Sequence, residues 1–176
     1  ARVLGTINTT PLNSAESNIV ITGFSPVDNI NYLAYNVASG LSTSNAIKIG
    51  EFSIQDGGDN APDADLLPTI LTGITFDVTG FSNILALAIF DSATNVSEST
   101  TVTSSTTFSG INSGVGISAP NDGTKTFSIY ATFNTTVTDN DQLQLIINNA
   151  EANGIIGSSF ETSDAGGAST PIVGDD

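Results

Sequence analysis

The chain contains no cysteine, histidine, methionine or tryptophan among its 176 residues. Without cysteine there is no disulfide framework, and cysteine usage says nothing about the redox compartment. Without histidine and cysteine, the chain cannot build a Ser–His or Cys–His nucleophile, nor a zinc site based on imidazole or thiolate. These classes of enzyme and metal site are therefore excluded by composition.

Basic residues are almost as scarce. Lys and Arg number 3 against 18 Asp and Glu, which gives a net charge of −15. The three bases, Arg2, Lys48 and Lys125, are scattered along the chain. Because phosphate backbones and anionic lipids require basic patches, we expect no nucleic-acid partner. No apolar run reaches eighteen residues, so we expect no membrane insertion either.

Paired carboxylates remain conceivable as a glycosidase site, with Glu16, Glu51, Glu98, Glu151 and Glu161 as the candidates. Sugar platforms usually rely on tryptophan, which is missing, and aromatic residues make up only 7% of the chain. No glycine-rich phosphate loop precedes a helix, because helical periodicity is weak throughout. We therefore predict that the protein is not an enzyme.

Apolar and polar residues alternate with a period of two in several stretches, which is typical of half-buried strands. The predicted strand faces are Ile70, Ile74, Phe76 and Val78; then Phe127, Ile129, Ala131 and Phe133; then Leu143, Leu145 and Ile147. Turn signals rich in Gly, Asn and Asp separate these stretches. The pattern predicts an all-β, antiparallel sandwich in which Phe76, Phe127, Ile129 and Phe133 are buried.

Two stretches carry more detailed signals. Residues 84–90, ILALAIF, are apolar on both faces, which predicts a central strand with a further layer over Ala86 and Ala88. In residues 47–54 the apolar parity changes at Gly50. This change indicates a β-bulge at Gly50 or Glu51, and two short strands meeting at a kink would explain it equally well.

The loop that follows residue 55 concentrates acidic and amide side chains: Asp56, Asp59, Asn60, Asp63 and Asp65. Close carboxylates repel one another unless a cation or water separates them, and calcium takes oxygen ligands of this kind. The spacing does not match an EF-hand. The loop is therefore interpreted either as a solvated insertion or as a calcium site.

Residues 47–78, IKIGEFSIQDGGDNAPDADLLPTILTGITFDV, resemble a module found in tandem in very long secreted surface proteins of Bacteroidota. In that pattern a strand ending in F-x-I-x-D-G-G runs through an Asp-rich loop to LPT-x-LT-x-I-x-F. The resemblance covers residues 29–168 and extends to gliding and attachment adhesins. It implies an Ig-like sandwich repeat with a structural, adhesive role at the cell surface, and it identifies no ligand.

The same resemblance bears on a short motif. Asp91-Ser92-Ala93 matches the Asp-Ser/Thr-small pattern of O-glycosylation in that phylum, which implies a sugar on Ser92. An ordinary turn after the strand is the alternative interpretation.

The expected organisation is an extended N-terminal arm over residues 1–28, a sandwich module over 29–168 and a C-terminal linker over 169–176. The chain starts at Ala1 without a signal peptide, as expected of a processed product or a segment of a longer polypeptide. The arm carries Val3, Leu4 and Ile7 ahead of a linker at 11–17. We predict that these apolar residues contact a neighbouring copy; closing their own sandwich as a first strand is the alternative.

Taken together, the sequence predicts a non-enzymatic structural or adhesive module of an extracellular bacterial adhesin or fibre. Its partners would be neighbouring copies of itself and an unidentified surface or glycan. The alternative is a carbohydrate- or receptor-binding module with its ligand on the loops at one end of the sandwich.

Overall fold

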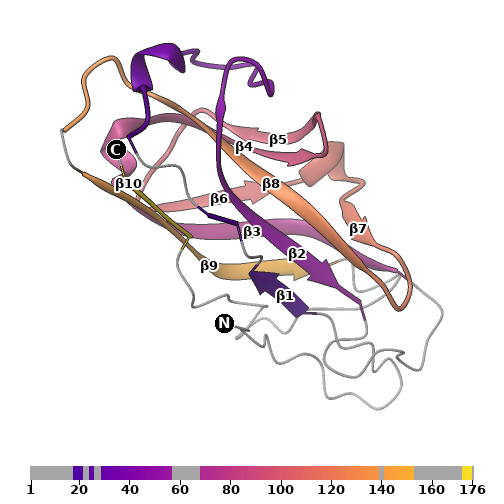
Figure 1. Ribbon diagram of the computed structural model, residues 1–176. Coiled ribbons are helices and arrows are strands. Elements are labelled where there is room, and N and C mark those ends of the chain that lie inside the picture. Colours follow the sequence, from indigo (N-terminus) through magenta and orange to yellow (C-terminus); the bar gives the residue numbers. More distant parts are fainter. Residues whose placement is uncertain are drawn as a thin grey trace.

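The computed structural model describes residues 18–21, 24–25, 29–56, 68–138, 141–152 and 172–175, the first and last of these ranges as backbone only. Ten strands and three short 3-10 helices lie in these ranges (Figure 1). The strands are β1 (Asn18–Ile21), β2 (Ile47–Gln55), β3 (Thr69–Thr79), β4 (Ile84–Asp91), β5 (Thr94–Ser99), β6 (Ser105–Ser109), β7 (Ile117–Ala119), β8 (Thr124–Phe133), β9 (Gln142–Ala152) and β10 (Ile172–Asp175). The helices are η1 (Tyr32–Ala34), η3 (Phe81–Asn83) and η4 (Ile111–Gly114). None of the helices in this part of the chain is long and apolar enough to cross a bilayer.

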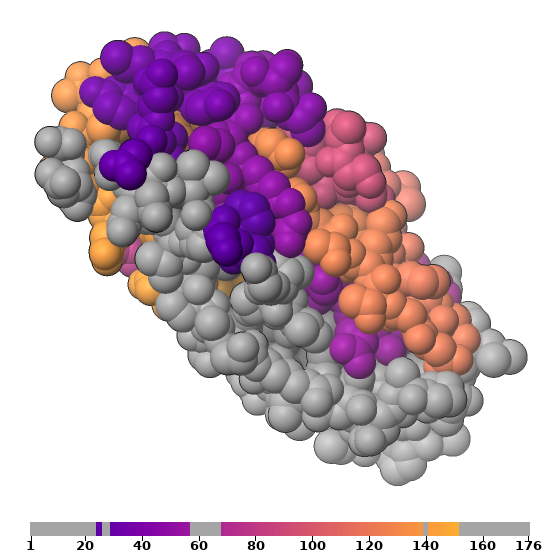
Figure 2. All heavy atoms as spheres, viewed as in Figure 1, coloured from indigo at the N-terminus to yellow at the C-terminus, as the bar shows by residue number. Residues whose placement is uncertain are grey.

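The strands form two antiparallel sheets that pack face to face (Figure 1). Sheet A has the order β1-β2-β8-β4-β5, and sheet B has the order β10-β9-β3-β6, with β7 also paired to β3. The space-filling view shows the described atoms as an elongated body, with the segment that begins at residue 29 gathered at its upper left (Figure 2). The predicted all-β antiparallel sandwich is confirmed.

The strand order is that of an Ig-like fold. In constant-type Ig domains the first, second, fifth and fourth strands share one sheet, and the third, sixth and seventh share the other. Here β1, β2, β8 and β4 occupy the first set of places, and β3, β9 and β10 occupy the second, in the same chain order. The strands β5, β6 and β7 are an insertion between the fourth and fifth positions.

Phenylalanine rings fill the space between the sheets. Phe52 and Phe127 come from sheet A, and their ring centroids lie 5.7 Å apart. Phe76 of sheet B meets Phe52 edge-on at 6.3 Å and Phe108 at 5.9 Å. All four are buried, as are Ile129 and Phe133. The four residues predicted to be buried from strand parity are therefore confirmed as core residues.

A β-bulge interrupts β2 beside Gly50. Lys48 pairs with Tyr130 and Gly50 pairs with Ile129, so Ile49 is the extra residue and the strand continues as one element. This confirms the predicted bulge, displaced by one residue, and excludes two separate strands. Because a bulge shifts the side-chain alternation by one, both Ile49 and Phe52 are buried.

A second bulge corrects the predicted face of β3. The register with β9 shifts between Leu71 and Gly73, leaving Thr72 as the extra residue. Leu71 is consequently fully buried, whereas Ile70 is only partly buried. The prediction that Ile70 shares the core face with Ile74 was wrong, because a simple alternation of apolar residues does not reveal a bulge between them.

The outer face of β4 is covered by the segment 37–46, called the strap below. Ala86, Ala88 and Phe90 pack with Leu41 and Ala46 of the strap in a second, smaller apolar cluster. The further layer predicted from ILALAIF is therefore confirmed.

Glu98 of β5 holds the strap in place. Its Oε1 accepts a hydrogen bond from the Gly40 backbone N–H at 2.8 Å, and its Oε2 accepts one from the Leu41 N–H at 2.8 Å. Asn95 Nδ2 donates to the same Oε2 at 2.8 Å and to the Leu41 carbonyl at 3.1 Å. Hydrogen bonds to a charged carboxylate are the stronger kind, so this clamp stabilises the covered face.

The paired structure extends past the expected module limits at both ends. β1 lies within the range expected to be an arm and pairs with β2, and β10 lies within the expected linker and pairs with β9. The boundaries at residues 28 and 169 therefore do not mark the ends of the sheets. Short edge strands of this kind depend on partner strands that are distant in sequence.

Thr132 offers a test of packing on the outer face of sheet A. It lies on β8, is fully buried, and its hydroxyl has no hydrogen-bond partner. An unpaired buried hydroxyl is destabilising. We expect Thr132→Val to raise the free energy of unfolding by about 1 kcal/mol in urea titrations.

Thr106→Val is the matched control, because the Thr106 hydroxyl is also buried but donates to the Thr103 carbonyl and accepts from the Thr103 N–H, both at 3.0 Å. The same substitution should lower stability there by about 1–2 kcal/mol. A loss at Thr132 as large as that at Thr106 would contradict the assignment.

Candidate functional site

The acidic loop begins at Asp56, which is fully buried. Its Oδ1 accepts a hydrogen bond from Thr69 Oγ1 at 2.5 Å, and its Oδ2 accepts one from the Asp122 backbone N–H at 2.8 Å. The Asp56 N–H donates to the Gly123 carbonyl at 2.8 Å. Asp56 thus joins the end of β2, the start of β3 and the turn before β8; this set of contacts is called the latch below.

The other members of the predicted calcium set, Asp59, Asn60, Asp63 and Asp65, lie outside the described residues. Within the described ranges no group of three or more His, Cys, Asp or Glu side chains is placed to hold a metal ion. The calcium site therefore stays a prediction. What the structure adds is a role for Asp56 that needs no ion.

The latch predicts a stability effect that separates the two interpretations of Asp56. Asp56→Ala removes the acceptor of two buried donors, so we expect it to cost about 2–4 kcal/mol in thermal or urea unfolding. Asp56→Asn keeps one acceptor oxygen and should cost less. The loss should be the same with added calcium and with a chelator; a loss that appears only in calcium would assign Asp56 to an ion instead.

Three of the candidate glycosidase carboxylates, Glu51, Glu98 and Glu151, lie among the described residues. Glu51 lies on β2 and pairs with Lys48, Glu98 on β5 holds the strap, and Glu151 lies on β9 of the other sheet. Glu16 and Glu161 lie outside the described residues. The three described glutamates are thus on separate strands, and none of them lines the pocket described below.

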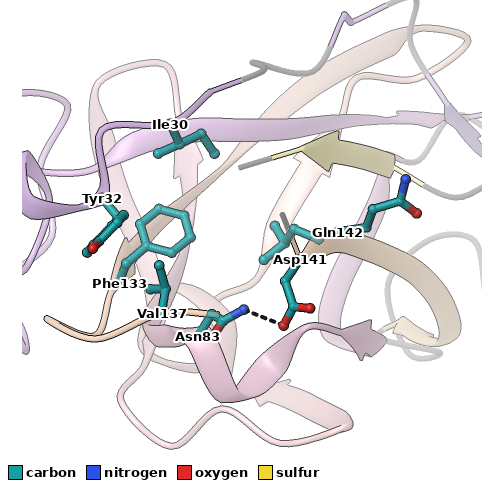
Figure 3. Close-up of a pocket in the computed structure, with 8 residues that line it drawn as sticks. Ile30, Tyr32, Asn83, Phe133, Val137, Asp141 and Gln142 are labelled. Carbon is teal, nitrogen blue, oxygen red and sulfur yellow. Dashed lines mark hydrogen bonds between the residues drawn. The ribbon is translucent and has the colours of Figure 1, made fainter. Parts of the chain in front are cut away.

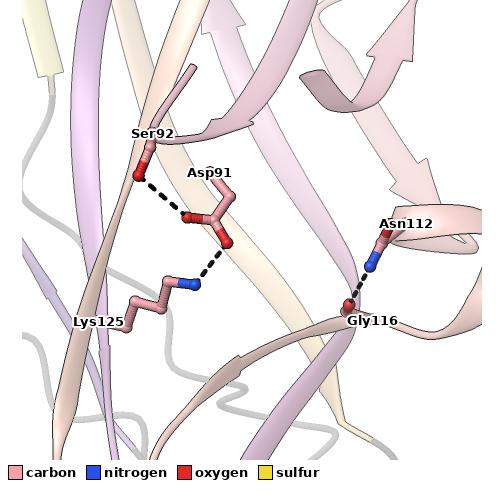
Figure 4. Close-up of polar contacts among 5 residues, drawn as sticks. All are labelled: Asp91, Ser92, Asn112, Gly116 and Lys125. Carbon is pink, nitrogen blue, oxygen red and sulfur yellow. Dashed lines mark hydrogen bonds and ion pairs between the residues drawn. The ribbon is translucent and has the colours of Figure 1, made fainter. Parts of the chain in front are cut away.

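Ser92 lies in the exposed two-residue turn between β4 and β5 (Figure 4). Its hydroxyl donates to Asp91 Oδ1 at 3.4 Å, and the other oxygen of Asp91 forms an ion pair with Lys125. Its φ is +56°, in the left-handed region that hairpin turns usually fill with glycine. The Ser92 hydroxyl therefore lies on a surface turn. This position agrees both with glycosylation of Ser92 and with an ordinary turn.

The backbone of Ser92 makes a second stability prediction, for the unmodified protein. A side chain in the left-handed region costs about 1–2 kcal/mol, partly offset by the chain entropy that glycine loses on folding. We expect Ser92→Gly to raise stability by about 0.5–1 kcal/mol, measured by urea unfolding. Ala93→Gly, whose φ is not positive, should give no gain; equal gains at both positions would refute the strain argument.

The turn at Gly110–Gly116 escaped sequence reasoning. Asn112 and Ser113 have positive φ of 52° and 57°, and Asn112 Nδ2 donates to the Gly116 carbonyl at 3.2 Å (Figure 4). Val115 at its surface is 71% exposed. The abundance of glycine in GINSGVG is the signal from which such a turn could have been expected.

An apolar pocket opens at the end of the sandwich where β3 and β8 finish and β4 and β9 begin (Figure 3). Its cavity volume is about 20 Å³, roughly the room for one water molecule. The lining residues are Ile30, Tyr32, Asn83, Phe133, Val137, Asp141, Gln142 and Leu143. This end is called the pocket end, and the end that carries Asp56 and the turn at 120–123 is called the latch end.

Two polar residues of the pocket, Asn83 and Asp141, are hydrogen-bonded to each other. Asn83 Nδ2 donates to Asp141 Oδ2 at 2.9 Å, and Asn83 Oδ1 accepts from the Thr138 N–H at 3.1 Å (Figure 3). The Asn83 carbonyl accepts from the Asn134 N–H at 2.9 Å. Asn83 therefore fixes the loop after β8 against the start of β4 and shapes the pocket.

Two exposed apolar side chains belong to the helices beside this pocket. Leu33 of η1 is 56% exposed and Phe81 of η3 is 39% exposed. Leu33 is in the same short helix as the lining residue Tyr32, and Phe81 is in the same short helix as the lining residue Asn83. Sequence periodicity did not find this surface, because its residues come from four segments that only the fold brings together.

Comparison with known protein families, with curated proteins and with solved structures finds no match to this chain. The resemblance to adhesin repeats consequently stays a prediction, and the fold and its surfaces carry the functional argument.

Val3, Leu4 and Ile7 lie outside the described residues, so their predicted contact with a neighbouring copy also stays a prediction.

Proposed function

We propose that this chain is a non-enzymatic structural and adhesive module of a bacterial extracellular adhesin or fibre, arranged head to tail with copies of itself. The observation that carries the proposal is the direction in which the chain crosses the sandwich. Asn18, where β1 begins, pairs with Gln55 at the latch end. Asp175, where β10 finishes, pairs with Gln142 at the pocket end.

A module that the chain enters at one end and leaves at the other can be joined to the next without reversing direction. The Ig-like strand order is compatible with this use, as in many cell-surface domains that share the sandwich architecture. Fold alone does not determine function, so the entry and exit of the chain at opposite ends of the sandwich are the stronger support.

Composition supports the proposal in a second way. A net charge of −15 opposes collapse of neighbouring modules onto one another, and a neutral polar coat suits a solvated stalk. Residues 29–47 and 99–121 contain no charged side chain.

The first strand of the sandwich supports the proposed role of the N-terminal segment. β1 already occupies the edge of sheet A beside β2. The first-strand position is therefore filled by residues 18–21, which favours the contact between copies that we propose for residues 2–7. Calcium in the acidic loop would stiffen the latch end, where such a contact would form.

Assembly can be tested on the purified full-length chain. We expect negative-stain micrographs to show end-to-end filaments, and sedimentation velocity to show multimers that grow with concentration. Deletion of residues 1–10 should leave the melting temperature close to that of the full chain and remove the multimers.

Two outcomes would contradict this function. Monodisperse globules at all concentrations would exclude self-assembly, and a specific signal on a glycan array would favour the carbohydrate-binding alternative. A deletion variant that is unfolded would show that residues 1–10 belong to their own sandwich.

A further inference from the structure

We propose that β1 and β10 are tension-bearing joints, through which a pulling force along a fibre enters one sheet of the sandwich and leaves the other. The inference rests on the proposed head-to-tail function, because only modules joined end to end transmit tension through both ends of the chain. It assigns a mechanical task to the two edge ladders, β1–β2 and β10–β9.

The direction of each edge strand decides how it is loaded. β1 runs from Asn18 at the latch end to Ile21, which pairs with Phe52 nearer the pocket end. A pull on the N-terminal side of β1, directed outward from the latch end, therefore acts along the axis of the strand. β10 runs towards the pocket end and finishes at Asp175, so an outward pull on the C-terminal side of β10 also acts along its axis.

A pull along the axis of an antiparallel strand loads its ladder in shear. The hydrogen bonds between antiparallel strands are perpendicular to the strands and come in closely spaced pairs, so an axial pull strains all of them together. A pull across the sheet strains them one pair after another, from the end of the strand inward. The same ladder therefore resists an axial pull better than a crosswise pull.

The strands behind the two joints distribute the force over longer ladders. β2 pairs with β8 over residues 47–55, and β9 pairs with β3 over residues 144–152. The force crosses from sheet A to sheet B through the packed core, where Phe52, the register partner of Ile21, meets Phe76 edge-on. β1 and β10 are each only 4 residues long. The short edge ladders are therefore the elements that yield first.

Single-molecule force spectroscopy with cysteine handles tests the joints directly, because the full-length chain has no cysteine of its own. Asn18→Cys and Asp175→Cys place the handles at the outer ends of β1 and β10, so that pulling between them loads both ladders in shear. Urea unfolding checks that the variant is folded. Ser17→Cys with Asp176→Cys, one position outside each strand, is the second handle pair for the same direction.

Two matched handle pairs load the same ladders across the sheets. Asn18→Cys with Thr94→Cys pulls β1 away from β5, which is the opposite edge of sheet A. Asp175→Cys with Ser105→Cys pulls β10 away from β6, which is the opposite edge of sheet B. Thr94 and Ser105 are both exposed, so handles at these positions disturb no buried side chain.

The comparison of rupture forces decides the matter. A four-residue antiparallel ladder holds about two bonded pairs, which are loaded together in shear and singly in a crosswise pull, so we expect the first rupture force in shear to be about twice that in each crosswise geometry. Equal first rupture forces in the two directions would overturn the inference.

A core variant separates mechanical strength from general stability. Ile89 of β4 is fully buried, and Ile89→Val removes one methyl group from the core away from both edge ladders. We expect this variant to lower the urea midpoint and to leave the first rupture force between positions 18 and 175 unchanged, because forced unfolding is governed by the barrier of the loaded element. A rupture force that falls in step with the urea midpoint would overturn the inference, since overall stability would then set the resistance.

These outcomes are distinguishable from failure of the proposed function, because rupture force is measured on single modules and assembly on the unmodified chain. Filaments built from modules that rupture at the same force in both directions would refute the joints and leave the head-to-tail function standing. A chain that never assembles would refute that function, and with it the task of carrying tension along a fibre.

Discussion

The sandwich depends on one row of phenylalanine rings held between its sheets. Phe52 and Phe127 from sheet A meet Phe76 and Phe108 from sheet B at centroid distances of 5.7–6.3 Å. The chain has no cysteine with which to cross-link the sheets. Burial of apolar surface must therefore supply most of the stability. The bulges in β2 and β3 follow from the same requirement, because they return apolar side chains to the inner face where simple alternation would have turned them outward.

Three of the acidic side chains that the structure describes hold loops in place. Asp56 joins three segments at the latch end, Glu98 holds the strap against β4, and Asp141 holds Asn83 at the pocket end. In each case a carboxylate oxygen accepts a hydrogen bond from a group on another segment of the chain. A high negative charge is thus compatible with a compact fold, since part of it is used for structure while the net excess keeps copies apart in solution.

The two ends of the sandwich differ in chemistry as well as in position. The latch end carries the start of β1 and the buried Asp56, and the pocket end carries an apolar recess together with the end of β10. A contact between unlike ends is heterologous, and heterologous contacts that do not close into a ring propagate as filaments. The asymmetry of the ends is therefore the structural basis of the proposed assembly.

Local patterns in the sequence determined the fold class, the burial of Phe76, Phe127 and Phe133, the layer over β4 and the bulge beside Gly50, because alternation and parity depend only on neighbouring residues. They did not determine that Leu71 rather than Ile70 is buried, that Asp56 is a latch, or that β1 and β10 join the sheets. The sequence pattern did not predict the pocket either. Each of these features requires partners far apart in the chain, and only tertiary packing decides which of them meet.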